Sequence, residues 1–165
     1  MTSTMAVTSF EQLLRRHRPE IGAYLRRLMG NESDAEDVGQ DTWLRAHRAY
    51  GRLPPDANAR AWLYRIATNR ALTALRHRQR RARATVEVEL DTLPGRAGGL
   101  ESAATLRAVA RAVADLPPKQ RAALVARRFH GLAYDEIGAT LGCSVTAARA
   151  NVYQAIRKLK ERLEA

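Results

Sequence analysis

Apolar residues recur along the first part of the chain at three- and four-residue spacing, which is the period of an amphipathic helix. The first such stretch runs from residue 10 to residue 29. Its apolar positions are Phe10, Leu13, Leu14, Ile21, Leu25 and Leu28. Pro19 predicts a break or kink in this helix, because proline cannot donate to the backbone ladder. Gly30 is the predicted C-cap.

A second helix is predicted from Ser33 to about Tyr50. Ser33 and Glu36 have the Ser-x-x-Glu spacing of a capping box, which satisfies two backbone donors at a helix start. The predicted inner face consists of Val38, Thr42, Trp43, Ala46 and Tyr50. Gly39 lies inside this helix and is expected to cost about 1 kcal/mol relative to alanine.

A third and longer helix follows a loop at residues 51–58, which contains two prolines. Asn58 is its predicted N-cap, and the helix extends to about Arg81. Its packing positions are Trp62, Leu63, Ile66, Ala67, Leu72 and Leu75. Residues 82–99 are rich in glycine and proline and are predicted to form a flexible linker. Residues 1–9 are predicted to be a disordered N-terminus.

Four more helices are predicted after the linker. They cover residues 100–116, 119–129, 134–141 and 145–163. The packing positions of the first are Leu106, Val109 and Val113. Gly131 and Gly142 end the second and third, and Ser144 caps the last. With no hairpin signal in the sequence, we expect an all-α fold of two small helical domains, residues 10–81 and 100–165.

Composition narrows the class of partner. The 165 residues carry a net charge of +11 at pH 7, because 28 Lys and Arg outnumber 17 Asp and Glu. Such a surplus favours nucleic acid or an anionic membrane. Apolar runs are too short to span a bilayer, and the first ten residues lack a signal-peptide pattern. Cys143 is the only cysteine, so no intrachain disulfide can form, and we expect a cytoplasmic protein.

The acidic residues are unevenly distributed. None occurs between Asp56 and Glu87, and none between Ile137 and Lys160, although both stretches are rich in arginine. The helix before the first gap is the opposite. It opens with Glu32, Asp34, Glu36, Asp37 and Asp41. This sorting of charge predicts two surfaces for a polyanion and one for a basic protein partner.

The segment from residue 134 to residue 163 has the pattern of a helix-turn-helix, with Gly142 in the turn. In this motif the second helix enters the major groove and presents its first residues to base edges. Here these residues are Thr146, Ala147, Arg149, Ala150 and Tyr153. Arg149 suits bidentate contact with guanine, whereas Arg157, Lys158 and Lys160 suit phosphates. A helical hairpin with a solvated basic face is the less favoured alternative.

The long helix at residues 59–81 is a second candidate DNA surface. Arginines lie beside Trp62 and Tyr64, and aromatic rings beside arginines can stack on unpaired bases. The alternative is that Trp62 belongs to the core, and charge and spacing alone favour that alternative.

The acidic helix admits three interpretations: a solvated face, half of a metal site, or a docking surface for a basic protein. A metal site requires converging ligands, and the next helix has no Asp or Glu to supply the other half. The four histidines and one cysteine show no zinc spacing. The sequence therefore predicts no metal, no cofactor and no catalytic residues. A metal-dependent nucleotide hydrolase using Glu36, Asp37 and Asp41 is a disfavoured alternative.

Three stretches together resemble a known family. DAEDVGQDTWLRA (34–46) and ARAWLYRIATNRALTALR (59–76) resemble the central domain of bacterial sigma factors. LPPKQRAALVARRFHGLAYDEIGATLGCSVTAARANV (116–152) resembles the C-terminal domain of the small extracytoplasmic-function group of the sigma-70 family. The resemblance implies a non-enzymatic factor that binds core RNA polymerase, directs it to promoters and assists promoter melting.

The resemblance also implies a role for each surface. The acidic helix would bind the coiled coil of the largest polymerase subunit through Asp34, Asp37, Gln40, Asp41 and Arg45. The domain at residues 10–81 would capture the unpaired −10 element through Asn58, Arg60, Trp62, Arg65, Asn69 and Arg70. The C-terminal domain would bind the duplex −35 element through Thr146, Arg149, Ala150, Tyr153, Arg157 and Lys158.

Further partners implied by the resemblance are the flap of the second-largest polymerase subunit and an anti-sigma factor, with the protein at the nucleoid. The sequence departs from the family at several positions. They are Gly39, Ala133, Ala147, Asn151 and Gln154. The loss of a serine at Ala133 removes an N-cap worth about 1 kcal/mol. The alternative function is a helix-turn-helix regulator that binds DNA without recruiting polymerase, but it would leave the acidic helix unexplained.

Overall fold

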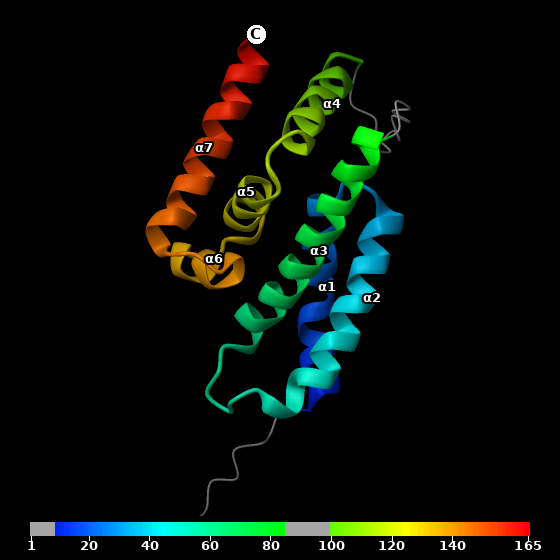
Figure 1. The fold of residues 1–165 in the computed structure, drawn as a ribbon, viewed down its shortest axis with the longest axis vertical. Coiled ribbons are helices and arrows are strands. Elements are labelled where there is room, and N and C mark those ends of the chain that lie inside the picture. Colours follow the sequence, from blue (N-terminus) through cyan, green and yellow to red (C-terminus); the bar gives the residue numbers. More distant parts are fainter. Residues whose placement is uncertain (1–8, 85–99) are drawn as a thin grey trace, which may run out of the picture.

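The computed structural model describes residues 9–84 and 100–165. Within these ranges every regular element is helical, which confirms the predicted all-α fold (Figure 1). The elements are α1 (Phe10–Met29), α2 (Glu32–Ala49), the short 3₁₀ turn η1 (Tyr50–Arg52), α3 (Ala59–Ala84), α4 (Leu100–Ala114), α5 (Pro118–His130), α6 (Tyr134–Leu141) and α7 (Val145–Glu164). The predicted disorder at residues 1–8 and most of the predicted linker, residues 85–99, lie outside the described residues.

Helix α1 is continuous through Pro19, so the predicted break does not occur. The Pro19 ring is on the exposed side of the helix, where a lost backbone hydrogen bond meets water rather than the core. Ser9 lies in the segment expected to be disordered, yet it caps α1 by a reciprocal capping box with Gln12. Gly30 ends the helix with φ 79°, as predicted.

Helix α2 begins earlier than the sequence pattern suggested. Its N-cap is Asn31, whose Oδ1 accepts a hydrogen bond of 2.8 Å from the Asp34 amide. Ser33 therefore lies inside the first turn, and the predicted capping box with Glu36 is wrong. Because α1 ends at Gly30, the next residue, Asn31, already has the extended backbone of an N-cap. The connection between α1 and α2 is therefore shorter than the predicted one, which ran to Ser33.

The α1–α3 bundle has an apolar core drawn from all three helices. Its fully buried side chains include Ile21, Tyr24, Leu25, Leu28, Leu63 and Tyr64. The third helix is capped by Asn58, as predicted, because the Asn58 side chain accepts from the Ala61 amide at 3.1 Å. It continues to Ala84, so the first residues of the predicted linker are helical.

Helices α4–α7 form the C-terminal unit. Gly131 and Gly142 take left-handed conformations at the ends of α5 and α6, and Ser144 caps α7. Gly138 allows the close turn between α6 and α7, since a Cβ there would lie 2.8 Å from the Cys143 carbonyl oxygen. Leu106 is 61% exposed, so its predicted packing role is wrong, and α4 meets the unit mainly through α7.

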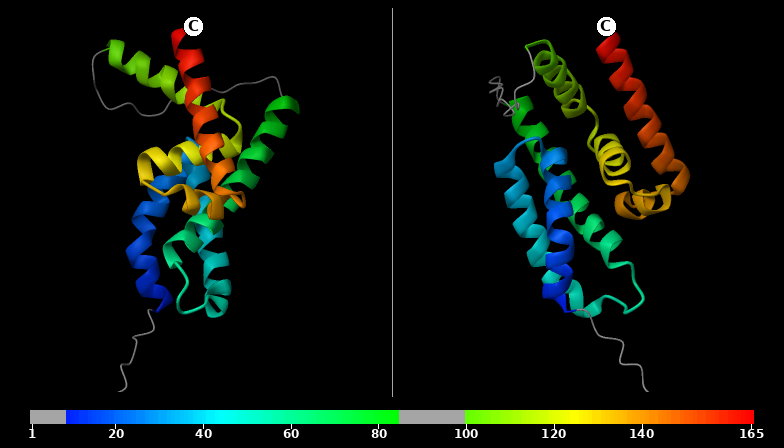
Figure 2. Two further views of the ribbon diagram at one scale, coloured as in Figure 1. Left: turned by 90° about the vertical axis from the view of Figure 1, so that its left-hand side faces the viewer. Right: turned by 180° about the vertical axis from the view of Figure 1, so that it is seen from behind.

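The two units lie against each other. Helices α5 and α6 pack on α1 and α3, as the two views of Figure 2 show. One apolar cluster runs from the α1–α3 bundle through Ala122, Val125 and Leu132 to Ile137 of α6. A separate, smaller cluster of Leu116, Leu124 and Ala155 joins α5 to α7. The described structure is thus a closed arrangement with a shared core.

Candidate nucleic-acid and protein interfaces

The predicted polymerase contacts lie along α2, but they are not equally available. Asp37, Gln40 and Arg45 are exposed. Asp34 is half-buried and paired with Arg78 of α3, and Asp41 is half-buried and paired with Arg70 of the same helix. Two of the acidic residues predicted to contact polymerase therefore form ion pairs between α2 and α3.

The ion pairs of α2 have an electrostatic consequence at Asp34. The hydrogen bond from Asn31 and the neighbouring Arg78 guanidinium lower the pKa of the Asp34 carboxyl, outweighing the rise caused by partial burial. Asp34 thus stays ionised at the helix N-terminus, where a negative charge is favourable.

Leu44 adds an apolar contact point to the exposed side of α2. It is 58% exposed, four residues after Gln40 and seven after Asp37, so the three share one face of the helix. Leu44 was not predicted as a contact residue, although a leucine among polar positions is a signal that the sequence carries. An acidic and polar face with an exposed leucine suits a protein partner better than a nucleic acid.

A groove of about 710 Å³ runs beside this face, between α1 and α2. Leu25, Ala35 and Trp43 give it apolar lining. Its polar borders are Arg15, Arg18 and Arg26 on α1 and Glu32, Glu36 and Gln40 on α2. Basic and acidic residues therefore face each other across an apolar floor.

The predicted −10 residues divide between different sides of α3. Asn58, Trp62, Arg65 and Asn69 recur at three- and four-residue spacing and share one face, on which Trp62 is half-buried and the others are exposed. Arg60 lies two residues from Trp62, a rotation of about 200° around the helix.

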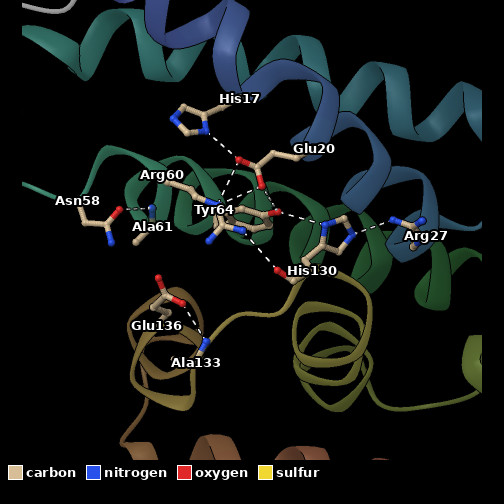
Figure 3. A network of polar contacts seen from close by, with 10 residues as sticks. All are labelled: His17, Glu20, Arg27, Asn58, Arg60, Ala61, Tyr64, His130, Ala133 and Glu136. Carbon is tan, nitrogen blue, oxygen red and sulfur yellow. Dashed lines mark hydrogen bonds and ion pairs between the residues drawn. The ribbon is translucent and has the colours of Figure 1, made fainter.

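Arg60 is turned toward the C-terminal unit, and Arg70 toward α2. The Arg60 Nε donates to Glu20 of α1, and its Nη2 donates to the His130 carbonyl at 3.3 Å (Figure 3). The structure therefore brings together four of the six predicted −10 residues and separates the other two.

Tyr64 cannot stack on unpaired bases. Its side chain is fully buried, and its hydroxyl donates to Glu20 at 3.0 Å. The aromatic partner expected beside the arginines is thus Trp62 alone. Burial raises the pKa of the Tyr64 phenol well above its ordinary value, and the neighbouring Glu20 carboxylate adds to this rise.

The predicted −35 residues form an exposed face on α7. Thr146, Arg149, Ala150, Tyr153 and Arg157 are exposed, and Lys158 is half-buried. The Arg149 guanidinium carbon lies 5.2 Å from the centre of the Tyr134 ring, a cation–π distance. Tyr134 of α6, which was not among the predicted site residues, thus supports the residue best suited to guanine.

Two unusual residues of α7 are held by neighbours. The Asn151 amide donates to the Ala147 carbonyl at 3.0 Å, so it folds back on its own helix. The Gln154 oxygen accepts from Gln120 of α5 at 2.9 Å. Gln154 keeps its own amide protons for another acceptor.

No group of three His, Cys, Asp or Glu side chains that could hold a metal ion occurs in residues 9–84 and 100–165. Among the same residues, no helix is long and apolar enough to cross a membrane. Cys143 is half-buried in the turn of the helix-turn-helix.

Comparisons with known proteins agree with this layout. The family model for sigma-70 region 2 matches residues 13–81, and the model for sigma-70 region 4 matches residues 106–159. The chain is 37% identical to the RNA polymerase sigma factor CarQ of Myxococcus xanthus over 159 residues, covering 96% of this chain and 91% of the relative. It is 34% identical to the ECF RNA polymerase sigma factor SigE of Mycolicibacterium smegmatis, covering 96% of this chain and 63% of that relative.

Solved structures show the same fold. The sigma factor RpoE in complex with the anti-sigma factor NepR from Bartonella quintana superposes with a TM-score of 0.74 at 26% identity, covering 94% of this chain and 97% of that chain. CnrH in complex with the cytosolic domain of CnrY gives a TM-score of 0.69 at 29% identity, covering 94% and 87%. The chain therefore belongs to the extracytoplasmic-function group of the sigma-70 family, and it is a transcription initiation factor rather than an enzyme.

Proposed function

We propose that the chain divides the work of a sigma factor among three surfaces. The exposed face of α2 binds core RNA polymerase, the α3 face around Trp62 captures the unpaired −10 strand, and the first turns of α7 bind the −35 duplex. The observation that carries this division is the segregation of charge. The exposed faces of α3 and α7 hold no Asp or Glu up to Lys160, whereas that of α2 presents Asp37.

The −10 surface consists, in this proposal, of Asn58, Trp62, Arg65 and Asn69. Trp62 packs on the core with one part of its side chain and leaves the rest accessible, so core packing and base stacking are compatible. Arg70 supports the site indirectly, because it is paired with Asp41.

Two further partners belong to the proposal. The solved relative RpoE is in complex with an anti-sigma factor, and the groove between α1 and α2, with its apolar floor, offers this chain a surface for such a protein. The flap of the second-largest polymerase subunit would contact the C-terminal unit. A protein with these partners would work at the nucleoid in the cytoplasm.

The decisive experiment is transcription in vitro with core polymerase on a library of genomic promoters. Specific initiation that depends on the protein is the expected result. Absence of specific initiation would contradict the proposal. Protein that binds promoter DNA alone, with no effect on polymerase, would support the rival regulator.

Arg149→Ala tests the −35 surface. Loss of a bidentate contact to guanine costs about 1–3 kcal/mol, so specific transcription should fall roughly tenfold or more while nonspecific DNA affinity falls less. Arg157→Ala is the matched control, since Arg157 pairs with Glu161 at 3.4 Å on the phosphate-facing part of the helix. Equal losses of specific and nonspecific binding by Arg149→Ala would show that Arg149 contacts phosphate only.

Asp37→Lys tests the polymerase surface. Asp37 is exposed, so charge reversal should spare the fold, whereas reversal at Asp41 would break its pair with Arg70. The affinity for core polymerase should drop, and binding of the isolated protein to DNA should not. Glu11→Lys on the exposed side of α1 is the matched control. Unchanged polymerase affinity in Asp37→Lys would remove Asp37 from the contact.

A further inference from the structure

The two units are joined by a polar contact that lies outside the α2, α3 and α7 faces proposed above for polymerase and DNA. His130, the last residue of α5, lies among side chains of the N-terminal bundle, of which Figure 3 shows Arg27, Arg60 and Tyr64. We call these side chains the His130 socket: Tyr24 and Arg27 of α1, and Arg60 and Tyr64 of α3. The Tyr24 and Tyr64 ring centres lie 5.3 Å and 6.0 Å from the centre of the imidazole ring, in edge-to-face geometry.

The hydrogen bonds of the socket determine the protonation state of His130. The imidazole Nε2 lies 3.0 Å from Arg27 Nη1. Because a guanidinium can only donate, Nε2 must accept and His130 must be neutral. Its proton is then on Nδ1, which donates to the Tyr64 hydroxyl oxygen 3.2 Å away.

This series of hydrogen bonds, from Arg27 through His130 and Tyr64, ends at the Glu20 carboxylate. The Tyr64 hydroxyl in turn donates a hydrogen bond to Glu20 Oε2 at 3.0 Å. The Glu20 carboxylate also accepts from Arg60 Nε at 3.1 Å and from His17 Nδ1 at 2.8 Å. Each donor in this series of hydrogen bonds therefore has an acceptor. Although partial burial alone raises the pKa of the Glu20 carboxyl, the hydrogen bonds from His17 and Tyr64 and the charge of Arg60 lower it overall.

The closed arrangement is incompatible with a two-part promoter. Elements at −10 and −35 lie about 25 base pairs apart, roughly 85 Å along a duplex at about 3.4 Å per pair. In the structure, α6 packs against both α3 and α7, and it is only about 12 Å long at about 1.5 Å per residue. The two units must therefore separate before both elements can be bound. The need for this separation rests on the proposed function, in which the two units bind different promoter elements. The closed arrangement itself does not depend on that proposal.

We propose that the His130 socket is a docking surface for the chain's own C-terminal unit, that it holds the free factor closed, and that it releases when His130 takes up a proton. An added proton on Nε2 would face the Arg27 guanidinium, with Arg60 also nearby. Glu20 of α1 is the acidic group that acts on the ring, Glu136 of α6 acts on Arg60, and α3 contains no acid. Protonation thus replaces a hydrogen bond with repulsion.

The direction of the pH effect follows from linkage. Burial, helped by Arg27 and Arg60, lowers the pKa of His130 below its ordinary value of 6.5 in the closed state. The open state therefore binds more protons, and the closed population should fall as the pH drops below 6.5. Glu20 has a lowered pKa, so its contribution is lost in a separate window, below its ordinary value of 4.5.

The test is single-molecule energy transfer in the full chain. Dyes would be placed on cysteines at exposed Ser33, at the start of α2, and Lys160 of α7, in a Cys143→Ser background, because the start of α2 and the end of α7 lie toward the same end of the molecule (Figure 1). The high-transfer, closed population should dominate in neutral solution. His130→Ala should lower the ratio of closed to open molecules roughly tenfold or more, as expected for loss of bonds to charged donors. His77→Ala, the same change at an exposed position of α3, should leave the ratio unchanged.

The variant His130→Asn distinguishes the effect of protonating residue 130 from the effect of losing its hydrogen bonds. Asparagine keeps a hydrogen-bonding group near Tyr64 but cannot be protonated, so this variant should stay more closed than His130→Ala and lose the pH response below 6.5. A low-transfer wild-type population in neutral solution would overturn the proposal. So would equal ratios for His130→Ala and His77→Ala, or an unchanged pH response in His130→Asn.

The same preparations distinguish this proposal from the proposed function. Wild-type protein that shows the closed population but no specific transcription with core polymerase would refute the assignment of surfaces and leave the socket intact. Protein that transcribes specifically but is open when free would refute the socket alone. Far-ultraviolet circular dichroism on each variant checks that helix content is retained.

Discussion

Two glycines, Gly30 at the end of α1 and Gly39 in the middle of α2, occupy opposite environments. Gly30 has φ 79°, and a Cβ there would lie 3.2 Å from Arg121 Nη2. Gly39 has an ordinary helical conformation, and a Cβ there would meet only Leu25 Cδ1, at 3.8 Å. The positive φ at position 30 favours glycine over every other residue. At position 39 the glycine only increases the conformational entropy of the unfolded chain, which lowers stability.

Gly39→Ala should therefore stabilise the protein by about 1 kcal/mol, the difference between glycine and alanine inside a helix. Urea denaturation followed by circular dichroism measures the change. Gly30→Ala is the matched control and should destabilise by about 1 kcal/mol or more, because alanine disfavours the left-handed region. A destabilised Gly39→Ala protein would mean that the groove beside α2 has no room for a methyl group.

Residue environments were harder to predict from sequence than helix positions. The period and caps of α3 are local signals, so its start at Asn58 was correctly predicted. The burial of Tyr64 depends on Glu20 and on His130, which is 66 residues away, and no local pattern encodes that contact. Trp62 and Tyr64 looked alike in sequence, yet only Trp62 remains partly accessible.

At the scale of elements, helix α6 begins without a side-chain cap. The Glu136 carboxylate accepts from the Ala133 amide at 2.8 Å, which is half of a capping box. The other half is missing because alanine has no oxygen to accept from the first turn. Helix α7, which begins at Val145, has the half that α6 lacks, since Ser144 Oγ accepts from the Ala147 amide at 3.1 Å.

Ala133→Ser should complete the box and stabilise the protein by about 1 kcal/mol. The reciprocal change, Ser144→Ala, should destabilise it by a similar amount. Thermal unfolding of both variants beside the wild-type chain gives the comparison. If serine at position 133 gave no gain, the turn before α6 would be held in a geometry that the hydroxyl cannot use.

At the scale of the whole molecule, the sequence predicted two helical units but not how they meet. The charge pattern singled out surfaces for partners, and it could not show that α5 and α6 cover one side of α3. The contact also contains an unfavourable feature. Arg121 of α5 is 5% exposed, its Nε has no hydrogen-bond partner, and Arg78 of α3 is a neighbouring like charge. A closed state with such a feature is easier to open.

The magnitudes indicate that the Arg121 charge opposes closure. Burial, together with Arg78, lowers its pKa to about 10, well below the ordinary value of an arginine, and each pKa unit corresponds to about 1.4 kcal/mol. A cation near a helix C-terminus, here Gly30 of α1, gains only about 1 kcal/mol. The unfavourable contribution is therefore the larger of the two.

Arg121→Met should accordingly favour the closed state, because methionine fills similar space without a charge, and replacing buried charges by apolar groups often stabilises by about 1–4 kcal/mol. The measurement is the closed population by energy transfer, together with the rate of association with core polymerase, which should slow. Arg121→Lys keeps the charge and should not increase closure. A more open Arg121→Met protein would show that the guanidinium holds the two units together, and that the cost of its burial is met by contacts with the end of α1.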